Sequence, residues 1–255
     1  LTAMALFALC WPGQWLARVM SPFKELSQAR LVPGVEVAAE SRSPAGHFTV
    51  LSAGAIPFRH APGLSMLAPV VPPEQMLLFH DGHGAGPIHR IADDLEAMAF
   101  MRWTPMALPY AMLAHPRVLV LGAGGGGDVG HGLLAGAVKV DAVEPHRELA
   151  DFVAQQFRSF AGNIYGRDRV RLHCADVRGF LAANRRTYDL IHISPMGTAT
   201  PSTGGGHALE PQPLYTVEGV HLALSRLSVS GLLTISLNVD LPPRAVPRSL
   251  RVDRE

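Results

Sequence analysis

The sequence predicts an α/β fold, in which a Rossmann-like, doubly wound and mainly parallel sheet is preceded by a small β-rich N-terminal subdomain. Three observations carry this prediction. An apolar strand runs directly into a glycine-rich turn at 118–127, and apolar strands then alternate with helix-type segments as far as 237. Before residue 92 the chain instead contains short β-type runs between prolines and glycines. Alternation of the first kind is typical of parallel strands with helices on both faces of the sheet.

The composition excludes several classes of protein. At 255 residues and 48% hydrophobic content, the chain can form a sizeable core. The net charge of +1 and the lack of long basic runs give no electrostatic footprint for nucleic acid, so no nucleic-acid partner is expected. Cys10 and Cys174 are isolated, which indicates neither a disulfide framework nor a zinc site and favours a reducing, cytoplasmic location.

The first segment, residues 1–30, is interpreted as membrane-proximal. Residues 1–11 are almost entirely apolar, but Pro12 and Gly13 end the run before it is long enough to span a bilayer. It is read as the end of a membrane helix, in which case the basic residues at 18, 24 and 30 place the following domain on the cytoplasmic face. The alternatives are a buried amphipathic helix and the end of a signal peptide.

The next segment, 31–91, is predicted to be the β-rich subdomain. Its short β-type runs lie at 35–38, 47–51 and 76–79. Asp81 and Gly82 form a typical two-residue hairpin turn. The neighbouring His80, His83 and His89 could suggest a metal, but their spacing matches no strong metal signature, so no metal is expected.

Residues 92–255 are predicted to form the nucleoside-binding domain. Two short, methionine-rich helices are expected within 92–114, as core filling or as an adaptable pocket. The remaining helices are expected at 128–134, 148–159, 177–184 and 214–227, and the strands at 118–121, 138–144, 169–174, 188–194 and 231–237. The long loop 195–213 is either a substrate lid or a plain surface connection. No further strand is predicted after 237, and an unpaired edge there favours a homo-oligomer.

The candidate site lies where these strands end, because open α/β sheets bind ligands beyond the carboxyl ends of their strands. The glycines fit G-x-G-x-G at Gly122, Gly124 and Gly126, and also G-x-G-x-x-G with Gly127. Glu144 ends the second strand about twenty residues later, where nucleotide folds place the acid that accepts hydrogen bonds from ribose. The alternative is a glycine-rich turn with no ligand. Two more polar residues follow the third and fourth strands, Asp176 and Ser194, and Asp176 could equally be a helix N-cap.

Several motifs resemble, in order and spacing, the spermidine synthase (polyamine aminopropyltransferase) family and its relatives among class I S-adenosylmethionine-dependent methyltransferases. The resemblance covers roughly residues 77–236. The apolar start and the segment 22–28 are similar to spermidine synthase-like proteins in which this unit follows membrane helices. The motifs that carry the resemblance are 118–127, 141–144, 175–176, 180–181, 188–189, 214–218 and Phe79-His-Asp-Gly82.

The resemblance implies roles for individual residues. Gly122, Gly124 and Gly126 would line the amino-acid or aminopropyl end of S-adenosylmethionine or decarboxylated S-adenosylmethionine. Glu144 would hold the ribose. The adenine would meet two residues at the start of the next helix, Asp176 and Val177.

Two departures from the family pattern concern the polyamine half of its signature. Gly125 stands where the family carries an aspartate, and Ser194-Pro-Met-Gly197 stands where it carries a D-S-S-D-type motif. No carboxylate of that pattern is left to orient a cationic diamine or accept its proton. Ser194 and Tyr215 remain as the weak catalytic candidates.

Three functions are therefore compatible with the sequence. The first is a spermidine synthase-like transferase that moves a methyl or aminopropyl group to an unidentified small-molecule acceptor, for instance an amine. The second is an NAD-dependent oxidoreductase, since the same glycines and Glu144 would serve a dinucleotide. The third is a catalytically degenerate binding module, which the loss of the signature aspartates supports.

Overall fold

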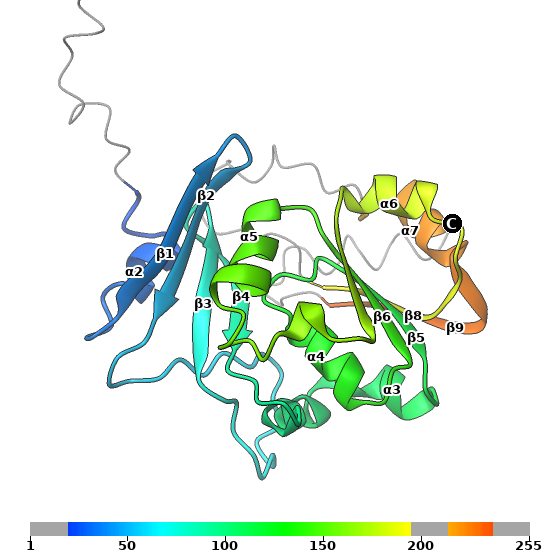
Figure 1. Ribbon diagram of the computed structural model, residues 1–255, viewed down its shortest axis with the longest axis horizontal. Helices are drawn as coiled ribbons and strands as arrows, with labels where there is room; N and C mark the ends of the chain where they lie inside the picture. The colour runs from blue at the N-terminus through cyan, green and yellow to red at the C-terminus, as the bar shows by residue number, and fades with distance from the viewer. Residues whose placement is uncertain (1–19, 195–213, 237–255) are drawn as a thin grey trace, which may run out of the picture.

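A computed structural model describes residues 20–194 and 214–236, which form two sheets (Figure 1). The first sheet is antiparallel, follows the short helix α2 (Glu25–Ala29), and has the order β1-β2-β3-β4. Its strands are β1 (Glu36–Ser43), β2 (Gly46–Ser52), β3 (Gln75–His80) and β4 (His83–His89). Two predicted features, the apolar run 1–11 and the loop 195–213, lie outside the described residues.

The second sheet has five strands in the order β7-β6-β5-β8-β9, and all its neighbouring pairs are parallel. Its strands are β5 (Arg117–Leu121), β6 (Lys139–Glu144), β7 (Val170–Cys174), β8 (Tyr188–Ile193) and β9 (Leu227–Ile235). The chain moves outward from β5 through β6 to β7, then crosses to the other side of β5 for β8 and β9. The predicted fold class is confirmed, and the strand order reverses between β5 and β8.

Both faces of the parallel sheet are covered, as the double winding requires. On β5, Val118 and Val120 belong to one apolar cluster, and Leu119 and Leu121 belong to another, because successive strand side chains point to opposite faces. The first face packs against α4 (Gly127–Leu134), α5 (Arg147–Asp151) and the π-turn η4 (Phe152–Gln156). The second packs against α6 (Val177–Ala183) and α7 (Val217–Leu224).

One apolar cluster joins the two sheets. Phe48, Leu78 and Ile88 of the antiparallel sheet pack in the same cluster as Val120 of β5 and Leu149 of α5. In Figure 1, α5 is drawn between the two sheets, in agreement with this cluster. The antiparallel sheet is therefore held directly against the parallel one.

Most element boundaries follow the sequence pattern, and the exceptions have local causes. The Asp81-Gly82 hairpin is confirmed: φ is 49° and 82° at its two turn residues. Strand β4 was not predicted, because Gly84, Gly86 and Pro87 interrupt its apolar pattern; as an edge strand it tolerates them.

The helical segments are shorter than their apolar patterns. The segment 92–114 forms η2 (Glu96–Trp103), η3 (Pro105–Ala107) and α3 (Leu108–Met112), because Pro105 and Pro109 interrupt a continuous helix. The predicted helix 148–159 changes to π geometry after Asp151. The helix predicted at 214–227 is only α7, and the strand predicted from 231 begins at Leu227, which pairs with Tyr188. None of the helices in 20–194 and 214–236 is long and apolar enough to cross a membrane.

Candidate active site

The predicted site residues lie at one edge of the parallel sheet. Leu121 of β5 is in register with Val143 of β6 and Ile193 of β8, so the carboxyl ends of the strands are level. Glu144 pairs with Cys174 at the end of β7. The structure therefore brings together the residues at or just beyond these ends: Gly122, Glu144, Asp176 and Ser194.

The glycine turn is packed tightly against strand β4. A Cβ atom built on Gly125 would lie 1.9 Å from the carbonyl oxygen of Pro87, and one on Gly124 would lie 3.2 Å from that of Ala85. Gly126, with φ of 83°, is the N-cap of α4 and requires the conformational freedom of glycine. Gly124 and Gly125 therefore have a structural reason, the close approach of the β4 backbone, that the sequence pattern does not show.

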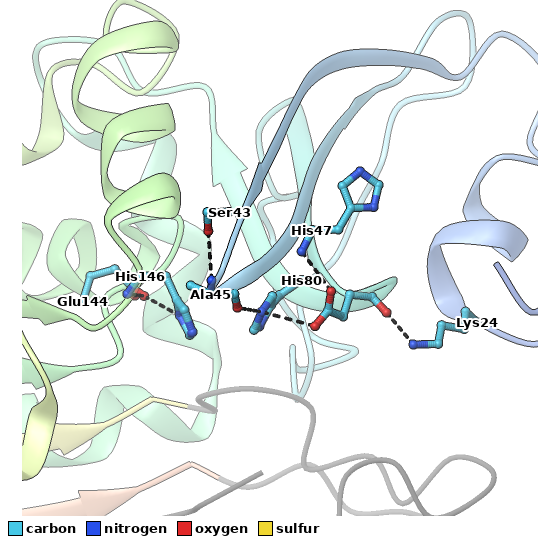
Figure 2. Close-up of polar contacts among 8 residues, drawn as sticks. Lys24, Ser43, Ala45, His47, His80, Glu144 and His146 are labelled. Atoms are coloured by element: carbon cyan, nitrogen blue, oxygen red, sulfur yellow. Dashed lines mark hydrogen bonds and ion pairs between the residues drawn. The ribbon is translucent and has the colours of Figure 1, made fainter. Parts of the chain in front are cut away.

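Glu144 holds the glycine turn from the next strand. Its side chain is only 3% exposed. Oε2 accepts a hydrogen bond from the Gly124 N–H at 2.8 Å, and Oε1 accepts one from the His146 N–H at 2.9 Å. The His146 Nδ1 atom also lies 3.2 Å from Oε1, and Figure 2 marks this contact with a dashed line. The carboxylate is thus fixed in place, and its remaining lone pairs can accept further hydrogen bonds.

His146 connects Glu144 to the antiparallel sheet. Its ring lies against the rings of His80 and Phe48, with centroids 4.6 Å and 5.4 Å away. His80 stacks on Phe48 and donates from Nε2 to the Ala45 carbonyl at 2.9 Å (Figure 2). A continuous set of contacts therefore links the candidate ribose anchor to the tip of the β1-β2 hairpin.

Tyr165 holds the same turn from the other side. Its hydroxyl donates to the carbonyl of Gly124 at 2.8 Å. Burial raises the pKa of Tyr165 well above its ordinary value, and the nearby Glu144 and Asp128 charges add to this. The hydroxyl consequently stays protonated, and the backbone of Gly124 is held at its carbonyl by Tyr165 and at its N–H by Glu144.

A second carboxylate, Asp128, lies in the first turn of α4. The hydroxyl of Ser194 donates to its Oδ2 atom, and Nε2 of His192 lies 3.4 Å from the same oxygen. His192 shares a hydrogen bond of 2.7 Å with Thr234 through Nδ1. Burial raises the pKa of Asp128, but His192 and the Ser194 hydroxyl outweigh burial, so the pKa lies below its ordinary value. Asp128 is therefore ionised at neutral pH.

Two buried histidines surround this cluster. His131 follows Asp128 by one helical turn, packs against the Tyr110 ring at 4.6 Å, and is 2% exposed. His89 of β4 lies 3.2 Å from the amide nitrogen of Gln75. Burial lowers the pKa of each histidine to about 4, so both are neutral at pH 7.

The other predicted residues have simpler surroundings. Asp176 is exposed and is the N-cap of α6, accepting a 2.6 Å hydrogen bond from the Gly179 N–H. Val177 is buried in the second apolar cluster. The Tyr215 hydroxyl is buried and has no hydrogen-bond partner within 20–194 and 214–236, and burial raises its pKa to about 12. Contact of Asp176 and Val177 with adenine stays a prediction.

His80, His83 and His89 lie on β3 and β4. In the part of the chain that the structure describes, no three histidine, cysteine, aspartate or glutamate side chains form a group that could hold a metal ion. His80 is instead engaged by Phe48 and Ala45.

Sequence reasoning did not assign a role to Asp128, His192 or Tyr165. Two signals were available: Asp128 directly follows the glycine turn, and His192 lies two residues before Ser194, on the same face of its strand. No local signal pointed to Tyr165, which reaches Gly124 from 41 residues away in the sequence.

These features define a Rossmann-like α/β fold with an additional antiparallel sheet packed on its glycine turn. The chain is similar in structure to a spermidine synthase in complex with the transition-state analogue AdoDATO, with a TM-score of 0.53 and 14% identity. The similarity covers 86% of this chain and 62% of that one. For the spermidine synthase from Thermotoga maritima the TM-score is 0.49 at 14% identity, covering 78% and 56%.

The chain thus spans less than two thirds of the length of these spermidine synthases, and at this identity the likeness shows the fold alone. No protein-family model matches the sequence. The search of curated proteins also gives no match.

Proposed function

We propose that this chain is a spermidine synthase-like transferase domain that binds S-adenosylmethionine or decarboxylated S-adenosylmethionine. In this proposal it transfers a methyl or aminopropyl group to a small-molecule acceptor. The observation that carries the proposal is the fixed, buried carboxylate of Glu144 beside the glycine turn, at the edge where such sheets bind ligands. The likeness in fold to a spermidine synthase supports it.

Glu144 has the chemistry of a ribose anchor. Its contacts are two backbone amides and one imidazole, so no lysine or arginine side chain within the described ranges occupies it. Oε2 has one contact and retains a lone pair, and Oε1 retains one in the tautomer in which His146 Nδ1 carries no proton, so two adjacent ribose hydroxyls could then donate to both oxygens at once. Tyr165 and Glu144 together hold the Gly124 peptide still, which keeps the backbone ready for a ligand.

A bound sulfonium donor supplies an electrophilic carbon: the acceptor's lone pair forms the new bond, the carbon–sulfur bond breaks, and its electron pair leaves a neutral thioether. The protein's part in such a displacement is mainly to align the two reactants and exclude water. The acceptor proton then needs a base or water to receive it. The few ionisable groups at this edge are compatible with that demand.

The test is direct binding of three ligands to the chain by titration calorimetry: S-adenosylmethionine, decarboxylated S-adenosylmethionine and NADH. We expect at least one sulfonium ligand to bind with a Kd in the micromolar range, about −8 kcal/mol, and NADH to bind more weakly. Tighter binding of NADH would favour the oxidoreductase. Binding of none of the three would overturn the proposal, and binding without turnover over a panel of amines would favour the degenerate module.

A further inference from the structure

Asp128 and Ser194 meet across the point where the strand order reverses. Asp128 lies in the helix that follows β5, and Ser194 directly follows β8, the neighbouring strand on the other side. Their hydrogen bond joins positions 66 residues apart in the sequence. In open α/β sheets the crevice at this reversal is where ligands bind.

The carboxylate of Asp128 is stabilised by a hydroxyl and an imidazole and, among the described residues, not by a fixed cation. In the described parts of the chain, no lysine or arginine lies within 4.0 Å of its carboxylate, and its nearest ionisable neighbour is His192. The comparable carboxylate of β6, Asp141, has both His173 at 3.0 Å and Arg186 at 3.7 Å. Neither neighbour carries a permanent positive charge, so the ionised carboxylate of Asp128 attracts an incoming cation.

Asp128 and His192 differ in their exposure to solvent. The side chain of Asp128 is 15% exposed and that of His192 only 5%, so the carboxylate is the more accessible of the two. Nε2 of His192 is buried and aimed at Asp128, but has no hydrogen-bond partner within the described ranges. The ionised carboxylate of Asp128 is only an acceptor, and beyond the hydrogen bond from Ser194 it attracts cations or N–H donors.

We propose that Asp128 is the counter-ion for a positive group of the ligand, and so determines the specificity of the site for cationic adenosyl ligands. This inference rests on the proposed function. The positive group is either the sulfonium centre or the primary ammonium of an aminopropyl chain, which share the same charge. Asp128 thus takes a place in the site that differs from the family's aspartate position, here Gly125, which β4 closes to side chains.

The experiment compares four ligands that share adenosine and differ in charge. They are 5′-methylthioadenosine without a charge, S-adenosyl-3-thiopropylamine with only the ammonium, S-adenosylmethionine, and decarboxylated S-adenosylmethionine. Each is titrated calorimetrically into the wild-type chain, Asp128→Asn and Asp141→Asn. Asp141→Asn is the matched control, because it neutralises a buried carboxylate on β6 that the proposal does not use.

We expect Asp128→Asn to weaken the binding of decarboxylated S-adenosylmethionine by roughly 10- to 100-fold. The binding of 5′-methylthioadenosine should weaken by less than about twofold. Asp141→Asn should leave the ratio between these two ligands unchanged. If the binding of S-adenosyl-3-thiopropylamine weakens to the same extent, the ammonium is the group that Asp128 contacts. If only the binding of the two sulfonium ligands weakens, Asp128 contacts the sulfonium.

Equal weakening of charged and uncharged ligands by Asp128→Asn, or no weakening, would overturn the inference while leaving the proposed function in place. If the wild-type chain binds none of the four, both fail together. Ser194→Ala keeps the carboxylate and serves as a second variant should Asp128→Asn not fold. The Ser194→Ala variant must still bind the charged ligands more tightly than 5′-methylthioadenosine. If it does not, the inference is contradicted as well.

Discussion

The carbonyl oxygen of Pro87 lies 1.9 Å from the point that the Cβ atom of any larger residue at position 125 would occupy, closer than real Cβ atoms come to backbone. Only glycine fits there, because Pro87 lies on β4 and the contact is with backbone that cannot rotate away. An aspartate at this position, as in the family pattern, would need the hairpin to move.

The first prediction tests this contact. Gly125→Ala should lower the free energy of unfolding by about 3 kcal/mol, the cost of overpacking against a rigid neighbour. Urea denaturation measures this. Gly127→Ala is the control: its Cβ would lie 3.2 Å from a side-chain atom of His89, a far longer approach than the 1.9 Å at Gly125 and not to backbone. Similar losses in the two variants would show that β4 does not clamp the turn.

The second prediction concerns Glu144. Replacement by alanine removes a charge-assisted, two-point contact with ribose and should weaken nucleoside binding by about 2 kcal/mol, or roughly thirtyfold. Titration with 5′-methylthioadenosine reads this out. Asp189→Asn is the control, since Asp189 also accepts a backbone hydrogen bond, from the Arg117 N–H, but lies at the opposite edge of the sheet. Unchanged affinity in the alanine variant would reject the ribose assignment.

The third prediction concerns the acceptor. Putrescine is protonated near neutral pH, and an aminopropyltransferase needs carboxylates to bind it and take up its proton. Asp81 and Asp94 are engaged by the backbone N–H groups of His47 and Glu96. Putrescine should therefore be a poor acceptor with decarboxylated S-adenosylmethionine. Chromatographic detection of spermidine at a turnover of roughly one per second would instead support a plain spermidine synthase.

The fourth prediction is a loss of stability in mild acid. The pKa of His89 and of His131 is about 4 in the folded chain, below the ordinary 6.5. Below pH 6.5 the unfolded chain therefore binds protons that the folded chain does not, and stability falls as the pH drops towards 4. At pH 5 each histidine should account for about 2 kcal/mol.

Urea denaturation at pH 7 and pH 5 measures that loss. His131→Gln removes one titrating group. The free energy of unfolding that this variant loses between pH 7 and pH 5 should therefore be about 2 kcal/mol smaller than the wild-type loss. His221→Gln, at an exposed position of α7, is the control. A wild-type pH dependence in His131→Gln would contradict the assignment.

The fifth prediction separates residues 1–19 from the segment that follows. Leu26 of α2 is fully buried and its N–H donates to the Gly82 carbonyl at 3.0 Å. A chain that starts at Met20 should therefore keep its thermal midpoint, and one that starts at Leu31 should lose about 3 kcal/mol, as for deletion of a buried leucine.

The same truncation tests the expected membrane tether. If residues 1–19 are the end of a membrane helix, the full chain should sediment with phosphatidylcholine–phosphatidylserine vesicles and the chain from Met20 should not. Equal sedimentation of the two chains would remove the basis for a tether in this segment.

Much of the fold was predictable because local pattern decides it. Val118 to Leu121 form a continuous apolar run that suits a strand buried on both faces, and Asp81-Gly82 is a strong hairpin signal. The end of each parallel strand was predicted closely enough to bring Glu144 and Ser194 to one edge. The edge of the sheet that carries the candidate site was predicted from a general rule, that open α/β sheets bind ligands beyond the carboxyl ends of their strands, without knowledge of any contact.

What the sequence did not reveal depends on distant contacts. Gly124 matches a nucleotide-binding pattern and Gly125 lies inside it, yet β4 backbone packs against both. Strand β4 itself was not recognised because Gly84, Gly86 and Pro87 interrupt its apolar pattern. Asp128 was read only as the start of a helix. Its contact with Ser194 depends on the lateral pairing of β5 and β8, which spacing along the chain does not encode.

The close packing of β4 on the glycine turn restricts how this chain can exchange parts with other proteins. A fusion that carried over only the parallel sheet and its helices would leave the Gly124–Gly125 backbone bare and would expose the apolar side chains that now face Phe48 and Ile88. Grafting a different hairpin would require backbone of the same shape, since side chains cannot fill a gap that admits no Cβ. The two sheets are therefore expected to be inherited and transplanted as a single unit.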